Sequence, residues 1–140
     1  PQLDFPDTQS RSDGGATIRD LVFYNNRSVD FLQEILADYN SRQIVMELKN
    51  VREIEREHIN QLNRYLSNEF GSFGVIVTRS PLSRAMFRNT VELWSGQRRC
   101  IVTLTDSDIE LMVEVFESKQ RLPVEVLKKK FVEFRRACPT

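Results

Sequence analysis

The chain has 140 residues, of which 40% are hydrophobic and 29% are charged, a balance typical of one soluble globular domain that needs no disulfide or structural metal. Basic and acidic side chains number 20 each, and a formal net charge of zero argues against a general electrostatic binder of nucleic acid. No apolar stretch approaches the roughly 18 residues of a membrane span and no signal-peptide pattern opens the chain, so we expect a cytoplasmic protein without a membrane partner.

The first half of the chain predicts a hairpin and then a helix between two strands. The first residue is Pro1, so we expect residues 1–140 to form a single domain cut from a longer chain, with an N-terminal partner domain missing. The turn signal at residues 13–15 precedes an apolar run over residues 16–24, which favours an antiparallel hairpin. Residues 28–39 have apolar side chains at helical spacing, with Ser28 as the expected N-cap, and residues 43–51 form the next strand.

The second half predicts three further helix-linked elements and two final helices. Residues 52–70 give the strongest helical pattern, with Gly71 in the position after its end. The elements expected after it are a strand over 73–78, a helix over 81–94, a strand over 100–104, an amphipathic helix over 109–116 capped by residues 105–108, and a last helix from Pro123 to about Arg136 with Val124, Leu127, Phe131 and Phe134 inward. This order predicts an α/β domain with a mixed central sheet flanked by helices.

Acidic side chains occur on two of these strands, one of them next to a lysine. Glu47-Leu48-Lys49 follows the apolar run 43–46, and Asp20 interrupts the run 18–23. Because a strand points alternate side chains the same way, Glu47 and Lys49 share one face. Two carboxylates on neighbouring strands can hold a hard divalent cation, while the lysine orients or deprotonates a water. The pattern therefore indicates a metal-dependent phosphodiesterase.

Each of these residues also has a purely structural interpretation. Asp20 could be a charge at the hairpin edge, and Glu47 with Lys49 could be a pair on an exposed strand face. An acid within an apolar run is costly to bury without a partner, and the strand before Glu47 is apolar on both faces, as central strands are. A buried acid beside a lysine favours a functional site. The alternative acids, which lie in apparent turns or helices, are Asp13, Asp30 and Asp38.

The helix that follows the strand completes a family pattern. Asp20 in a strand, the segment Ile44-Val45-Met46-Glu47-Leu48-Lys49-Asn50 and the helical spacing Gln61…Tyr65 occur in that order. Together they resemble the PD-(D/E)xK superfamily of restriction-endonuclease-like nucleases, which includes type IV restriction enzymes and Holliday-junction resolvases. The resemblance covers residues 17–78 and departs from the family pattern in two ways: no proline precedes Asp20, and the N-terminal helix that often precedes the first strand is absent or cut off.

The resemblance implies a restriction-endonuclease-like core that cleaves phosphodiester bonds in DNA as a Mg²⁺-dependent endonuclease, with Mn²⁺ as an alternative ion. Asp20, Glu47 and the backbone carbonyl of Leu48 would be the metal ligands. Lys49 would act on the attacking water, and Gln61 would support the site or touch the nucleic-acid backbone.

Further contacts to nucleic acid are expected from residues around this core. They are His58 and Tyr65, which share a helical face with Gln61, and Arg79 and Arg84, which follow the strand over 73–78. A single histidine such as His58 is more often a boundary residue of its helix than a catalyst. Three alternatives stay open: an inactive nucleic-acid-binding or protein-interaction module of the same fold, a junction-specific resolvase acting as a homodimer, and RNA in place of DNA.

Overall fold

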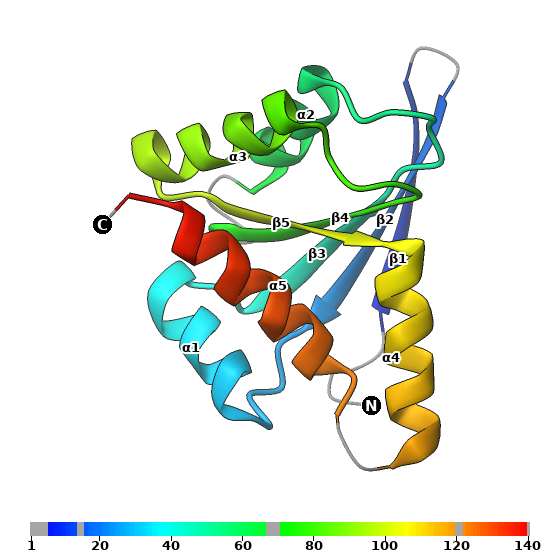
Figure 1. Cartoon of the computed structure of the whole chain (residues 1–140), viewed down its shortest axis with the longest axis vertical. Helices are drawn as coiled ribbons and strands as arrows, with labels where there is room; N and C mark the ends of the chain where they lie inside the picture. Colours follow the sequence, from blue (N-terminus) through cyan, green and yellow to red (C-terminus); the bar gives the residue numbers. More distant parts are fainter. Residues whose placement is uncertain (1–5, 14–15, 67–70, 120–121, 140) are drawn as a thin grey trace.

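In the part of the chain that the structure describes, five strands form one sheet, and their order in the sheet is their order in the chain (Figure 1). The computed structural model describes residues 6–13, 16–66, 71–119 and 122–139, without the side chains of 6–13, 16–21, 23 and 24. The elements are β1 (Pro6–Asp13), β2 (Ala16–Tyr24), α1 (Asp30–Tyr39), β3 (Gln43–Leu48), α2 (Arg56–Tyr65), β4 (Phe73–Thr78), α3 (Arg84–Gln97), β5 (Cys100–Thr105), α4 (Asp106–Ser118) and α5 (Val124–Ala137). The predicted order of strands and helices is confirmed.

The sheet changes from antiparallel to parallel at β3. β1, β2 and β3 pair antiparallel, whereas β3, β4 and β5 pair parallel. Parallel neighbours need a crossover connection, and α2 and α3 supply the two crossovers. The prediction of an α/β domain with a mixed sheet is therefore confirmed.

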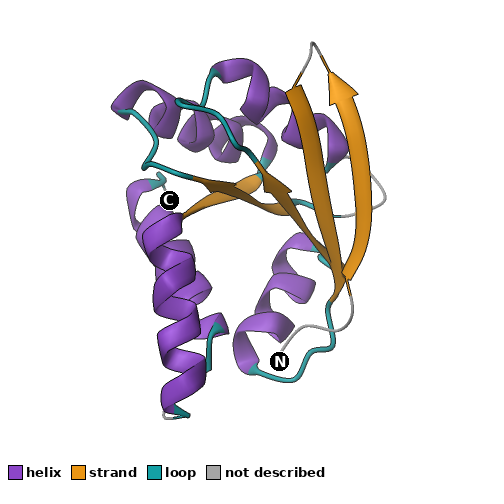
Figure 2. Ribbon diagram, turned by 90° about the vertical axis from the view of Figure 1, so that its right-hand side faces the viewer, coloured by secondary structure: helices purple, strands orange, loops and turns teal. Residues whose placement is uncertain are grey.

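Helices cover both faces of the sheet (Figure 2). α2 packs on one face, where Val45 of β3 and Ile76 of β4 belong to the same apolar cluster as Ile59 and Leu62. α1 and α5 pack on the other face in a second cluster. Alternate residues of β3 divide between the two clusters, because side chains alternate along a strand. The four apolar residues predicted to face inward from α5 are all buried.

α1 begins later than the sequence indicates. Its N-cap is Val29, whose side chain makes no capping hydrogen bond, so the prediction that Ser28 is the N-cap is wrong. The buried Asn25 orders this connection instead. Its Nδ2 donates to the carbonyl oxygens of Leu32 and Ser41 at 2.8 and 2.9 Å, which ties the end of β2 to α1 and to the start of β3.

α2 is shorter than the helix that the apolar pattern predicts over residues 52–70. It begins at Arg56 because Glu55 is its N-cap, with a capping box in which His58 takes part. It ends at Tyr65 with Leu66 as C-cap, so Gly71 is not the residue that terminates it. Gly71 has φ +79° and lies against the end of α1, where an added Cβ would come within 2.7 Å of the Tyr39 carbonyl oxygen. Glycine is needed there for a close backbone approach.

Capping side chains also determine where α3 and α4 begin. Ser83 caps α3 by accepting from the Met86 amide, so this helix starts at Arg84 and not at residue 81. The predicted capping box of α4 is confirmed, with Thr105 and Asp108 as its two members. Within the described ranges, no helix has the length and apolar character needed to cross a membrane.

Candidate active site

The register of β2 and β3 places the two predicted carboxylate positions opposite each other. Asp20 pairs with Glu47, and two residues further along the strands Val22 pairs with Val45. Directly opposed residues share a face of the sheet, and Val22 and Val45 both belong to the cluster beneath α2. Position 20 therefore lies on the face that carries Glu47.

Glu47 and Lys49 form a buried pair at the end of β3. The Glu47 side chain is 0% exposed and that of Lys49 is 3% exposed, and Lys49 Nζ lies 3.8 Å from Glu47 Oε2. The Lys49 amide donates to the Val77 carbonyl oxygen at 2.9 Å, so the pairing with β4 continues past Leu48. The separation of Nζ and Oε2 is an ion-pair distance, longer than a hydrogen bond. Burying such a pair is costly, which makes a purely stabilising role a weak explanation for it.

Gln61 reaches this pair from α2. Its Oε1 accepts a hydrogen bond from Lys49 Nζ at 3.2 Å. The buried neighbours Ile59 and Leu62 fix the rotation of α2 on the sheet, and this rotation brings Gln61 to the rim of the cluster. Tyr65, one turn further along α2, is partly buried against the same apolar cluster. The structure thus shows Glu47, Lys49 and Gln61 together.

His58 lies on the first turn of α2. Its Nδ1 accepts from the Glu55 amide at 2.9 Å, which completes the capping box. Burial lowers the pKa of His58, and the positive charge of Lys49 lowers it further, against the opposing effects of Glu55 and Glu57. A neutral ring is what the acceptor role of Nδ1 requires. His58 thus has a structural function, and its predicted contact with nucleic acid stays a prediction.

A pocket of about 460 Å³ opens beside Lys49 at the carboxyl ends of the parallel strands. Its lining residues are Leu48, Lys49, Asn50, Val77, Thr78, Arg79 and Asp106. Arg79 is exposed here, as a phosphate contact would need, whereas Arg84 lines a different pocket against β5. The sequence pattern does not identify Thr78 and Asp106 as site residues. Thr78 is the last residue of β4 and Asp106 directly follows β5, and the parallel pairing of β3, β4 and β5 brings both to the edge where Lys49 lies, which no spacing in the sequence indicates.

The predicted metal ligands are only partly within the described side chains. Among those side chains, no group of three or more His, Cys, Asp and Glu residues is arranged to hold a metal ion. The side chain of Asp20 is not among the described ones, so Glu47 is the one predicted carboxylate ligand whose side chain the structure describes. The oxygen donors of Asp20, Glu47 and the Leu48 carbonyl are of the kind that Mg²⁺ prefers.

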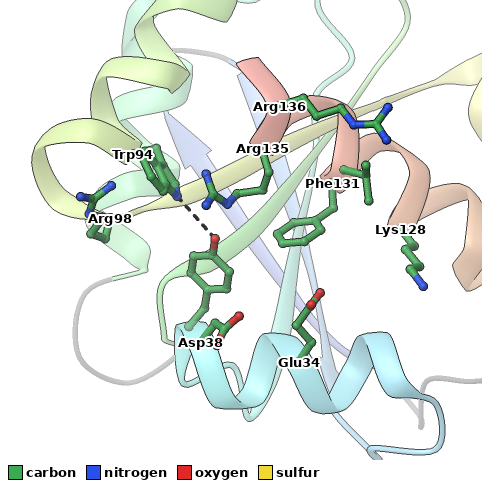
Figure 3. Close-up of a pocket in the computed structure, with 10 residues that line it drawn as sticks. Glu34, Asp38, Trp94, Arg98, Lys128, Phe131, Arg135 and Arg136 are labelled. Carbon is green, nitrogen blue, oxygen red and sulfur yellow. Dashed lines mark hydrogen bonds between the residues drawn. The ribbon is translucent and has the colours of Figure 1, made fainter. Parts of the chain in front are cut away.

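A second pocket of about 590 Å³ lies at the opposite ends of the parallel strands (Figure 3). Trp94 Nε1 donates to the Tyr39 hydroxyl at 3.4 Å, and the guanidinium groups of Arg98 and Arg135 each lie 4.1 Å from the Trp94 ring centroid. Arg98 caps the end of α3 and Arg135 lies in the last turn of α5, where positive charge offsets the helix dipole. These contacts account for the arginines structurally, and no predicted site residue lies here.

Comparisons with known proteins give one partial likeness. No protein-family model matches the chain, and no solved structure matches it. Over 74 residues the chain is 35% identical to a curated protein of Escherichia coli (strain K12) described as "Putative transposon gamma-delta 80.3 kDa protein". The match covers 52% of this chain and 11% of that protein, so the chain spans only a small part of the relative's length.

Proposed function

We propose that this chain is a restriction-endonuclease-like domain that hydrolyses phosphodiester bonds in DNA with the help of Mg²⁺. The observation that carries the proposal is the cluster at the end of β3. A fully buried Glu47 lies beside a buried Lys49, Gln61 holds the lysine by a hydrogen bond, and Asp20 occupies the paired position on β2. Buried ionisable groups beside an open pocket favour a functional site.

The sheet supports the same interpretation. β1, β2 and β3 form an antiparallel meander, and α2 then leads to β4, which lies parallel to β3. This arrangement puts the two carboxylate positions on adjacent strands and puts Gln61 above them on the crossover helix. It is compatible with the core that the family resemblance implies.

The donor set fits a hard divalent cation. Asp20, Glu47 and the Leu48 carbonyl would hold the ion, and all three provide oxygen ligands. When bound, Mg²⁺ would neutralise charge on the scissile phosphate and lower the pKa of a coordinated water.

The protein's own groups would position the reactants. Lys49 Nζ, fixed by Gln61, would orient the attacking water and stabilise the negative charge that develops on the phosphate. Arg79, exposed at the mouth of the pocket, would bind a neighbouring phosphate of the backbone. Because Lys49 is buried, few water molecules would screen its charge from the reacting phosphate.

The description of the matching Escherichia coli protein is consistent with a DNA substrate. Its description places it in a transposon, which is a DNA element, but names no activity. The family resemblance and the Glu47–Lys49–Gln61 cluster therefore carry the proposal.

A cleavage assay on supercoiled, linear duplex, single-stranded and branched DNA, with one RNA duplex, tests the proposal. We expect Mg²⁺-dependent products with 5′-phosphate ends on at least one DNA substrate, and none with EDTA. Cleavage confined to branched DNA would select a junction resolvase. Binding of DNA without cleavage of any substrate, at saturating Mg²⁺ or Mn²⁺, would contradict nuclease activity and leave an inactive binding module.

A further inference from the structure

α4 leaves most of its side chains exposed. Figure 1 shows it beside α5 at the margin of the molecule, and none of its residues is buried. It is held on its inner side by Asp108, whose Oδ1 lies 3.6 Å from Lys130 Nζ, and by Met112, which packs against the core cluster beneath α1 and α5. Its outer sides are therefore open to a partner.

Three exposed apolar residues of α4 fall in one stripe. Ile109, Val113 and Phe116 are 37%, 51% and 55% exposed. Their spacing of four and three residues places them one above another on the helix surface, at about 100° per residue. Single exposed apolar residues are ordinary, but a contiguous stripe along a helix is typical of an interface.

An acidic stripe runs beside the apolar one. Glu110, Glu114 and Glu117 repeat the same spacing one residue later, and all three are exposed. α4 also contains Asp106 and Asp108 but no lysine or arginine. None of the three glutamates is ion-paired with another residue in the part of the chain that the structure describes. The helix therefore offers an apolar seam with a negative flank.

We propose that α4 is the docking surface for a basic amphipathic helix of a partner protein. An apolar stripe of the partner would pack on Ile109, Val113 and Phe116, as in helix-in-groove and coiled-coil recognition. Lysine or arginine side chains on its flank would pair with the three glutamates. Complementary flanking charge sets partner choice and orientation in such helix pairs.

Charge and burial argue against other occupants of this surface. Two copies of α4 packed antiparallel about a two-fold axis would bring their acidic flanks together, which is repulsive. The basic helix α5 of a second copy has its apolar residues buried in its own core and cannot supply the seam. DNA and anionic lipid carry the wrong charge. This surface is independent of the proposed active site, because its stripe is built from residues outside the pocket beside Lys49.

The probe is a fluorescently labelled helical peptide of leucine and lysine heptads, with a leucine and glutamate peptide as its charge-reversed counterpart. We expect fluorescence anisotropy to show binding of the lysine peptide only. The combined change Val113→Ser with Phe116→Ser should weaken that binding at least tenfold without altering the circular dichroism spectrum, since both residues are exposed.

Charge reversal on the helix makes the test specific. The triple change Glu110→Lys, Glu114→Lys, Glu117→Lys should exchange the preference, so that the glutamate peptide binds. The control triple change Glu34→Lys, Glu53→Lys, Glu92→Lys alters the net charge equally at other exposed glutamates and should leave the preference unchanged. Equal effects of the two triple variants, no binding of the lysine peptide, or a dimer that Phe116→Ser dissociates would each overturn the proposal.

Discussion

Gln61 makes the most informative contact at the residue scale, because a neutral amide can hold a buried ammonium group in place without competing for a metal ion. It accepts from Lys49 Nζ at 3.2 Å. We expect Gln61→Ala to slow cleavage by about 10- to 1000-fold, since one positioned hydrogen bond contributes about 1.4 to 4 kcal/mol to transition-state stabilisation.

Single-turnover kinetics with excess enzyme would measure this effect of Gln61→Ala. Gln61→Glu is the informative companion variant, because its carboxylate keeps an acceptor for Lys49 but adds charge beside Glu47. Unchanged kinetics in Gln61→Ala would mean that the hydrogen bond between Lys49 and Gln61 has only a structural role.

His58 reports on the same cluster without any activity measurement. It is the single histidine of the chain, so its NMR titration has one assignment. We expect a pKa below the usual 6.5, chiefly through burial, and we expect Lys49→Met to raise it partway by removing the second cause. A pKa that is insensitive to Lys49→Met would contradict the proximity of the two side chains.

The lowered pKa of His58 also makes the free energy of unfolding depend on pH. The unfolded chain takes up a proton on His58 near 6.5, while the folded chain resists it, so the unfolded state binds more protons below that pH. The contribution of His58 is present above pH 6.5 and is lost as the pH falls through the folded pKa. Urea unfolding at several pH values should show a smaller fall in stability over this window for His58→Gln.

At the scale of elements, two glycines give a matched test of the backbone. Gly71 combines a positive φ with a close approach to the end of α1, so Gly71→Ala should destabilise the fold by about 2 kcal/mol or more. Gly96 lies in α3, and an added Cβ there meets no atom within 4 Å. Gly96→Ala should stabilise the fold by about 0.5 kcal/mol. Equal effects of the two changes on thermal unfolding would be inconsistent with the described backbone.

The elements also show what a sequence can predict. The sequence predicts the strand over 73–78 to the residue, because its apolar run is bounded on both sides by turn residues. The starts of α2 and α3 are less predictable, because each depends on which side chain reaches a free amide. Glu55 and Ser83 take that role, and Asn25 orders the connection before α1 through contacts with residues distant in the chain.

The candidate site likewise contains residues that the sequence could predict and residues that it could not. Glu47, Lys49 and Gln61 could be associated from spacing along one strand and one helix face. Thr78 and Asp106 could not, because only the parallel pairing of β3, β4 and β5 brings their positions to the pocket beside Lys49.

For the whole molecule, a bound metal should stabilise the fold by mass action. An ion that binds only the folded state at about 100 times its Kd adds about 2.7 kcal/mol. We expect Mn²⁺ or Mg²⁺ to raise the Tm of the protein by several degrees and to leave that of Glu47→Gln unchanged. Ca²⁺ should also raise it without supporting cleavage. An identical rise in the Tm of Glu47→Gln would mean that the ion binds at another site.

The most direct test of the proposed nuclease is the Mg²⁺-dependent nicking of supercoiled plasmid by Lys49→Ala, measured beside the unsubstituted protein. Lys49 supplies no ligand oxygen, so the variant should still show the metal-induced rise in Tm. It should lose cleavage by a factor on the order of 10² to 10³ or more, because the group that we propose to orient the water and stabilise the developing charge is gone. Nicking by Lys49→Ala at the rate of the unsubstituted protein would contradict the account.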